Sequence, residues 1–267
     1  RDHGWHKPNP VLAQQVGTPD TCLSCHEDKD SNWSVSYVTQ WFGKKQGEEP
    51  FAPIFALADS GYQKITPHLS KIAQSHQYAE IIRASALARM ASSPDTNTLI
   101  AIARAVKHSD SHIRRGAIDG AINIKPAEKW RILSPLLTDK VLAVRSEAAM
   151  ALAPLWTKLS TEQKNVLQPA LDDYLAIQAF NADRGYAHTN KAIVLGYQNK
   201  MPQAFAAYQQ SIRIEPYFAP AYVNMAELYK RQGQDKQAIK VLKQGIDANP
   251  SDSSIAYNLG LAYIRAK

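Results

Sequence analysis

Both cysteines of the 267-residue chain lie in one short stretch, TPDTCLSCHEDK, at residues 18–29. Cys22 and Cys25 are three positions apart, and His26 follows the second cysteine directly. Two thiols at this spacing on a helical turn face the same side, where they can form thioethers with the two vinyl groups of one porphyrin. The next residue then lies beneath the iron as its proximal ligand. The spacing therefore predicts one covalently attached haem c, held by Cys22, Cys25 and His26.

Three other kinds of site use the same residue types. A structural zinc site would combine Cys22 and Cys25 with two of the histidines His3, His6 and His26. A thioredoxin-like redox pair would need a preceding strand in a βαβ unit, and the sequence shows no such pattern. A plain local disulfide is the remaining alternative, since small exported modules use such bonds. The complete Cys-x-x-Cys-His spacing favours haem, with zinc as the alternative cofactor.

The elements that must position this motif are short helices. Thr18 as N-cap and Pro19 at the first helical position predict a helix that carries the motif. After it, WSVSYVTQWFG places Trp33, Tyr37 and Trp41 four residues apart, which puts their rings on one face of a second helix. Such a face suits packing beside a porphyrin, and it equally suits the core of a small helical segment.

The sixth ligand of such an iron decides its chemistry. A histidine gives a low-potential electron-transfer haem, a methionine raises the potential, and an open position permits ligand chemistry. His3 and His6 are the local candidates, within the stretch DHGWHKPNP. The methionines and the other histidines fall among helical repeats, where packing or surface roles are expected.

Residues in the C-terminal third of the chain recur with a period of 34, which is the length of a tetratricopeptide repeat. The period needs small residues where the two helices of a hairpin meet and a proline after the second helix. We expect hairpins with helices at about 185–198 and 202–214, then at about 219–232 and 236–248, followed by one more helix. The residue pairs that carry the period are Ala204 and Ala238, Pro216 and Pro250, and Tyr229 and Tyr263.

A second period, of 31 residues, lies upstream. It aligns YAEIIRASALARMA, DSHIRRGAIDGAIN and DKVLAVRSEAAMAL, with Arg83, Arg114 and Arg145 in register. This pattern resembles short HEAT-like repeats, in which an apolar-arginine pair precedes small residues on the packing face of a helix. We expect the arginine column to bond to loop carboxylates or carbonyls and to serve structure, because repeat interfaces commonly need such a polar contact.

The periods together predict an all-α chain, a helical-repeat solenoid that is HEAT-like and then tetratricopeptide, preceded by a small haem-binding segment. The expected parts are 1–50 for the haem segment, 51–160 for the HEAT-like repeats, and 161–267 for a linking helix with about two and a half tetratricopeptide repeats. No run approaches eighteen apolar residues, so no membrane span is expected.

With these motifs in hand, the N-terminal stretch resembles the multihaem c-type cytochromes that carry C-terminal tetratricopeptide repeats. The likeness rests on RDHGWHKPNP, GTPDTCLSCHEDK and WFG within residues 1–43, and more loosely on the repeats of 80–267. Members of that family carry further Cys-x-x-Cys-His motifs upstream, so the resemblance implies that this chain is the C-terminal part of a larger cytochrome. It also implies the roles of the site residues: Cys22 and Cys25 for attachment, His26 as proximal ligand and His3 as distal ligand. His6 stays the weaker distal candidate, from its place in the same stretch.

These features favour an exported bacterial electron-transfer protein, periplasmic or extracellular, because haem attachment takes place outside the cytoplasm. Its solenoid would dock a protein partner, either a redox partner or a peptide in a groove. The alternative is a pure interaction scaffold whose cysteine motif is unoccupied or binds zinc. The residues expected to line the tetratricopeptide groove are Asn190, Lys191, Tyr222, Asn224 and Tyr229.

Two further classes are disfavoured by the sequence. The net charge of +7 could attract nucleic acid, but no arginine-rich run or aromatic RNA-binding motif accompanies it. A Ser-His-Asp set, paired carboxylates and a phosphate-binding loop are all missing, so independent catalysis is not expected. A role as a subunit or fragment of a multihaem oxidoreductase stays open.

Overall fold

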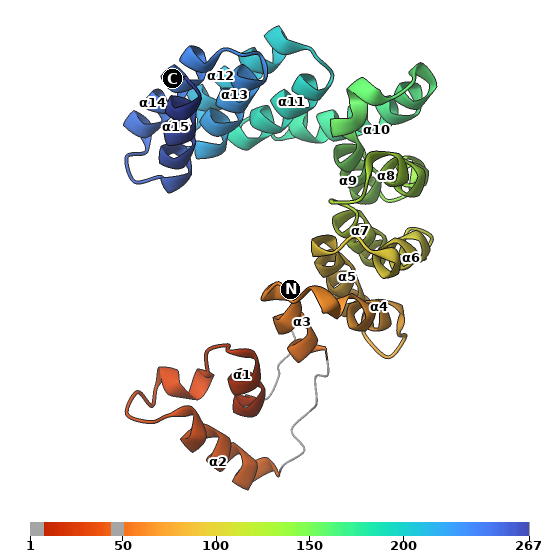
Figure 1. The fold of residues 1–267 in the computed structure, drawn as a ribbon, viewed down its shortest axis with the longest axis vertical. Helices are drawn as coiled ribbons and strands as arrows, with labels where there is room; N and C mark the ends of the chain where they lie inside the picture. Colours follow the sequence, from red (N-terminus) through yellow and green to blue (C-terminus); the bar gives the residue numbers. More distant parts are fainter. Residues whose placement is uncertain (1–7, 44–50, 267) are drawn as a thin grey trace. The chain divides into compact units, whose positions relative to one another are not determined.

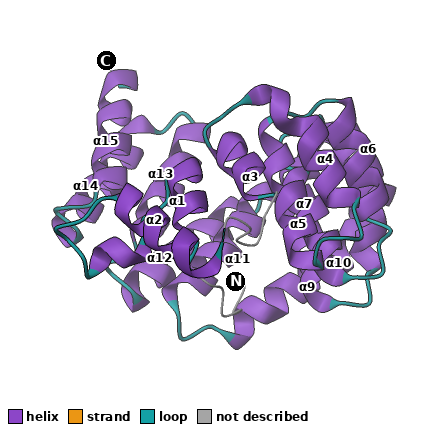
Figure 2. Cartoon of the chain, turned by 90° about the horizontal axis from the view of Figure 1, so that it is seen from below, coloured by secondary structure: helices purple, strands orange, loops and turns teal. Residues whose placement is uncertain are grey.

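The computed structural model describes residues 8–43 and 51–266 (Figure 1). Within these residues every regular element is a helix, fifteen α-helices and five short 3-10 helices (Figure 2). None of the described helices is both long and apolar enough to cross a membrane. The chain divides into two compact units between Ile124 and Lys125. The segment boundaries expected at 50 and 160 follow the repeat periods and not the compactness of the units, so they stay predictions.

The first unit begins with a small helical segment and continues with packed helical pairs. In α4–α7, successive helices lie against one another, and α5 and α7 pack most closely of all in this unit. Its elements are α1 (Pro10–Val16), η1 (Thr21–Ser24), α2 (Ser31–Phe42), α3 (Ala52–Asp59), η2 (Gln63–Ile65), α4 (Thr66–Gln74), α5 (Glu80–Arg89), η3 (Met90–Ser92), α6 (Thr96–Ala105) and α7 (Ser111–Gly120).

Small residues allow the close approach of α5 and α7. A Cβ atom built on Gly116 would lie 2.6 Å from the carbonyl oxygen of Ala84, and one on Gly120 would lie 2.5 Å from that of Leu87. Both distances are shorter than van der Waals contact, so only glycine fits these positions without moving backbone. The aligned Ala86 and Ala117 are fully buried, as expected for the packing face.

The arginine column bonds to backbone carbonyls, which lie in a loop for Arg114 and Arg145, as the sequence predicts, and in the last turn of α4 for Arg83. Arg83 donates from Nε to the carbonyl of Ala73 at 3.1 Å, and it is 5% exposed. Arg114 donates from Nη1 to the carbonyls of His108 and Ser109, at 2.8 and 2.7 Å. In the second unit, Arg145 does the same toward Asp139 at 3.2 Å and also pairs with the carboxylate of Asp173.

The second unit consists of helical hairpins in sequence order. The four helices expected from the 34-residue period begin and end within one residue of their expected bounds, and a fifth follows them. Its elements are α8 (Pro126–Leu133), η4 (Ser134–Thr138), α9 (Leu142–Leu152), η5 (Ala153–Lys158), α10 (Thr161–Phe180), α11 (Gly185–Tyr197), α12 (Met201–Ile214), α13 (Ala219–Arg231), α14 (Asp235–Ala248) and α15 (Ser253–Arg265).

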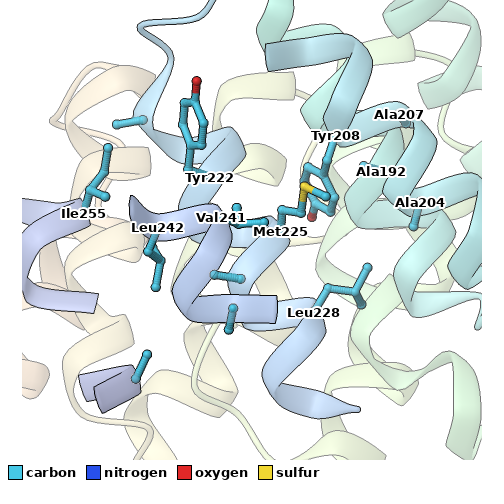
Figure 3. Packing of buried hydrophobic residues seen from close by; sticks show 14 of the residues in the cluster. Ala192, Ala204, Ala207, Tyr208, Tyr222, Met225, Leu228, Val241, Leu242 and Ile255 are labelled. Atoms are coloured by element: carbon cyan, nitrogen blue, oxygen red, sulfur yellow. The ribbon is translucent and has the colours of Figure 1, made fainter. Parts of the chain in front are cut away.

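The core of the last five helices follows the predicted period. Ala192, Ala204 and Ala238 are fully buried in this core. Larger side chains of the same cluster, such as Tyr208 and Met225, lie between the helices (Figure 3). Burial raises the pKa of the phenol of Tyr208, which lies in this core. Helices α11–α15 therefore pack around one continuous apolar cluster.

Candidate functional site

The Cys-x-x-Cys-His motif lies on a 3-10 turn. Helix η1 begins after Asp20, whose carboxylate accepts the backbone N–H of Cys22 at 3.0 Å. The N–H groups of Cys25 and His26 both donate to the carbonyl of Cys22, at 3.3 and 3.1 Å, which closes the turn. The prediction that Thr18 and Pro19 begin this helix was therefore wrong. A carboxylate at position 20 reaches the first free N–H group of the turn, so Asp20 is the N-cap.

The two cysteines carry free thiols on this turn. Cys22 is half-buried and Cys25 is exposed. Burial raises the pKa of the Cys22 thiol, and the nearby negative charge of Asp20 raises it further. The thiolate is the reactive form of cysteine, so Cys22 is less reactive at neutral pH than an ordinary exposed thiol.

An aromatic ladder, made of His26, Trp33, Tyr37 and Trp41, runs from the motif along α2. The ring centroids are 4.7 Å apart between His26 and Trp33, 5.3 Å between Trp33 and Tyr37, and 5.6 Å between Tyr37 and Trp41. The shared face of the three α2 rings confirms the predicted helical spacing, and the contact with His26 was not predicted. Tyr37 is 42% exposed and Trp41 is 64% exposed, so the ladder presents apolar surface beside the motif.

The segment that carries the ladder has a thin core. Among residues 8–43 only Pro10, Ser34 and Val38 are buried. Ser34 donates its hydroxyl to Asp20 and to the carbonyl of Ser31, so Asp20 ties the motif to α2. A segment of this size with so few buried side chains usually needs a bound group or covalent link for stability.

The chemistry of these groups fits a haem c. The turn offers two thiols and an imidazole, and the exposed rings beside it could cover a flat apolar macrocycle. No group of three or more metal-ligating side chains lies together within 8–43 and 51–266. His3 and His6 lie outside the described residues, so the predicted distal ligand and the zinc alternative stay predictions.

Of the five residues expected to line a tetratricopeptide groove, one is contradicted by the structure and the others stay predictions. Tyr222 is 1% exposed and donates its hydroxyl to the carbonyl of Pro216 at 2.9 Å, so its inclusion in the groove was wrong. Asn190 is half-buried and donates to Gln178 at 3.1 Å. Asn224 is half-buried and Lys191 is exposed. Tyr229 alone of the five lines the surface cavity described next.

A surface cavity of about 370 Å³ lies over α12, α13 and α14. The stacked rings of Tyr229 and Phe205, 4.3 Å apart, support one part of its floor. The only sequence signal for this site is the row of lysines at 236, 240 and 243, which helical spacing puts on one side of α14. The cavity is lined by Gln209, Ile212, Arg213, Met225, Tyr229, Gln237, Lys240, Val241 and Gln244.

Comparisons with known proteins agree with the helical repeats of the second unit. The model of the tetratricopeptide repeat family matches residues 197–261, from the end of α11 to within α15. A search of curated proteins found no match for the chain. Over the residues described, the chain is thus all-helical, with tetratricopeptide repeats near its C-terminus.

Proposed function

We propose that the chain is an interaction scaffold that docks a protein partner through its tetratricopeptide repeats. The observation that carries this proposal is the family match over residues 197–261, which includes every residue that lines the cavity. Stacked repeats present extended surfaces that bind peptides or helices. We extend the same reading to the upstream helices as HEAT-like repeats, on the strength of their buried arginine column and small packing faces.

Site-specific photocrosslinking tests the docking function. A photoreactive residue replaces Lys240 at the cavity, Lys191 on α11, or Lys107 in the first unit, and the protein is expressed in its host. A defined partner should be captured from a position in the second unit, and an excess of unmodified chain should compete it away. Capture from Lys107 alone, or no competed product from any position, would contradict docking by the tetratricopeptide repeats.

A second function is favoured by the cysteine turn: covalent attachment of one haem c for electron transfer. Cys22 and Cys25 would form the thioethers, and His26 would be the proximal ligand. His3 is the proposed distal ligand, with His6 as the weaker choice. A bound haem supplies reversible one-electron transfer. The free thiols, the exposed aromatic ladder and the thin core of residues 8–43 support this proposal.

The chain's own residues would position and shield such a group. Asp20 orients the turn through its bonds to the Cys22 N–H and the Ser34 hydroxyl. Trp33 and Tyr37 would exclude water from one side. On this reading the chain is an electron carrier rather than an independent enzyme, exported to the periplasm or exterior of a bacterium.

Absorption spectroscopy tests the haem proposal. The chain is produced in cells that contain the haem-attachment machinery, and its oxidised and reduced spectra are recorded with a pyridine haemochrome count. A c-type spectrum with one haem per chain is expected, and C22A/C25A should abolish it. An absence of haem under these conditions would overturn the proposal, and a zinc measurement would then test the alternative cofactor.

A further inference from the structure

We propose that the cavity over α12, α13 and α14 binds an acidic peptide segment of a protein partner, with one apolar side chain of that segment on the cavity floor. This proposal rests on the docking function and specifies its binding surface and the chemistry of its partner. It replaces the groove of Asn190, Lys191 and Asn224 as the place of peptide binding.

The charges of the lining residues select an acidic partner. Arg213 and Lys240 face the cavity from α12 and α14, and the lining contains no aspartate or glutamate. Neither side chain forms an ion pair within the described residues. A carboxylate placed between them would make charge-assisted hydrogen bonds, which are stronger than neutral ones.

Some cations of the same unit have carboxylate partners. Lys230 pairs with Glu227 at 2.8 Å, and Arg265 on α15 pairs with Asp235 at 3.1 Å. Among the residues that the structure describes, Arg213 and Lys240 have no such partner, and they line the same cavity, whose lining contains no carboxylate. A positive site lined by neutral amides attracts a partner of opposite charge and disfavours a basic one.

The floor of the cavity accepts an apolar group. Met225 and Val241 form part of it and are almost fully buried, at 4% and 8% exposure. Tyr229 is held beside them by its stacking on Phe205. Three glutamines on the walls, Gln209, Gln237 and Gln244, offer amide groups to a peptide backbone.

The size of the cavity favours a peptide segment over a folded surface. Its volume of about 370 Å³ lies at the lower end of the range for small-ligand sites and holds only a few side chains. An extended or helical segment can insert one apolar residue and place flanking carboxylates near the two cations. A flat protein face would leave the floor unfilled.

Fluorescence polarisation of the full chain tests this proposal. The probe is a labelled decapeptide of glutamates with one central leucine, and the comparison peptide carries lysines in place of the glutamates. We expect the acidic probe alone to bind, and R213Q/K240Q to weaken that binding by about tenfold or more, because two charge-assisted contacts are lost. Changing the central leucine of the probe to serine should weaken binding by about threefold or more, because the floor then lacks its apolar contact.

The variant K158Q/K200Q is the matched control. It removes the same two charges from exposed positions of the same unit, outside the cavity. Binding by this control should stay within about twofold of the wild type, since distant exposed charges contribute little. Equal losses in both variants, binding of the lysine peptide, or no binding of the acidic probe would each overturn the cavity proposal. A scaffold that docks its partner elsewhere would still give the competed crosslink, so the two failures are distinguishable.

Discussion

Replacing Gly116 with alanine tests how closely α5 and α7 approach each other. The new Cβ would lie 2.6, 2.7 and 2.9 Å from the carbonyl oxygen, Cα and carbonyl carbon of Ala84, where ordinary contact begins near 3.5 Å. Because all three atoms belong to the backbone, a rotamer change cannot relieve the overlap, and the two helices must separate. Overpacking of this kind costs about 1–3 kcal/mol, or more when backbone must move, against about 1 kcal/mol gained from the helix propensity of alanine. Because backbone must move here, we take the upper part of that range, about 2–3 kcal/mol, which leaves a net loss of about 1–2 kcal/mol in the free energy of unfolding of this unit.

Native-state hydrogen exchange measures this loss locally, in the peptides of α5 and α7. Their amides should exchange faster in G116A, by roughly tenfold for about 1.4 kcal/mol. G260A is the control, because a Cβ on Gly260 of α15 meets nothing within 4 Å and the same substitution there should stabilise by about 0.5–1 kcal/mol. Unchanged or slower exchange of α5 and α7 in G116A would refute the close approach of these two helices.

Three further substitutions test single contacts. D20N should lower the pKa of the Cys22 thiol, because it removes a negative charge and a hydrogen-bond acceptor that raise this pKa. The pH profile of Cys22 alkylation, followed by mass spectrometry, should therefore shift to lower pH. An unchanged profile would contradict this electrostatic role of Asp20. Y222F should lower the free energy of unfolding in urea by about 1 kcal/mol, because it removes the hydrogen bond from the phenol to the carbonyl of Pro216. An unchanged free energy would show that water replaces this bond. S160A should lower the local stability of α10 by about 1 kcal/mol, because Ser160 forms a capping box at the start of this helix. Hydrogen exchange of the α10 amides should become faster, and unchanged exchange would argue against the cap.

The helices of the second unit could be predicted because their spacing reflects packing. Ala204 and Ala238 recur after 34 residues since both lie where two helices meet, and both are fully buried. The arginine column was predictable for a similar reason, since Arg83 and Arg114 each bond to a backbone carbonyl that precedes their own helix. A contact that recurs in every repeat requires the same residue type at the same interval, and that interval is visible in the sequence.

The binding surfaces were harder to predict because they have no period. Tyr222 and Tyr229 lie seven residues apart on one helix, yet Tyr222 packs inside the core and Tyr229 lines the cavity. A sequence period shows that two rings share a helix, and it does not show which neighbours cover each ring. The pair Arg213 and Lys240 comes from two helices, so only the folded chain brings these cations together.

The N-terminal segment and the tetratricopeptide repeats differ in what stabilises them. In residues 8–43 three residues are buried and two rings of the ladder, Tyr37 and Trp41, are exposed, whereas α11–α15 share a continuous apolar cluster. A helix whose rings face solvent gains little free energy from folding alone, because its largest apolar groups stay in water. The repeats have a core of their own in the shared apolar cluster, and their surface carries the cavity and its two cations. Stability of the cysteine segment is therefore expected to depend on the group it binds, whereas the repeats should keep their fold with or without a partner.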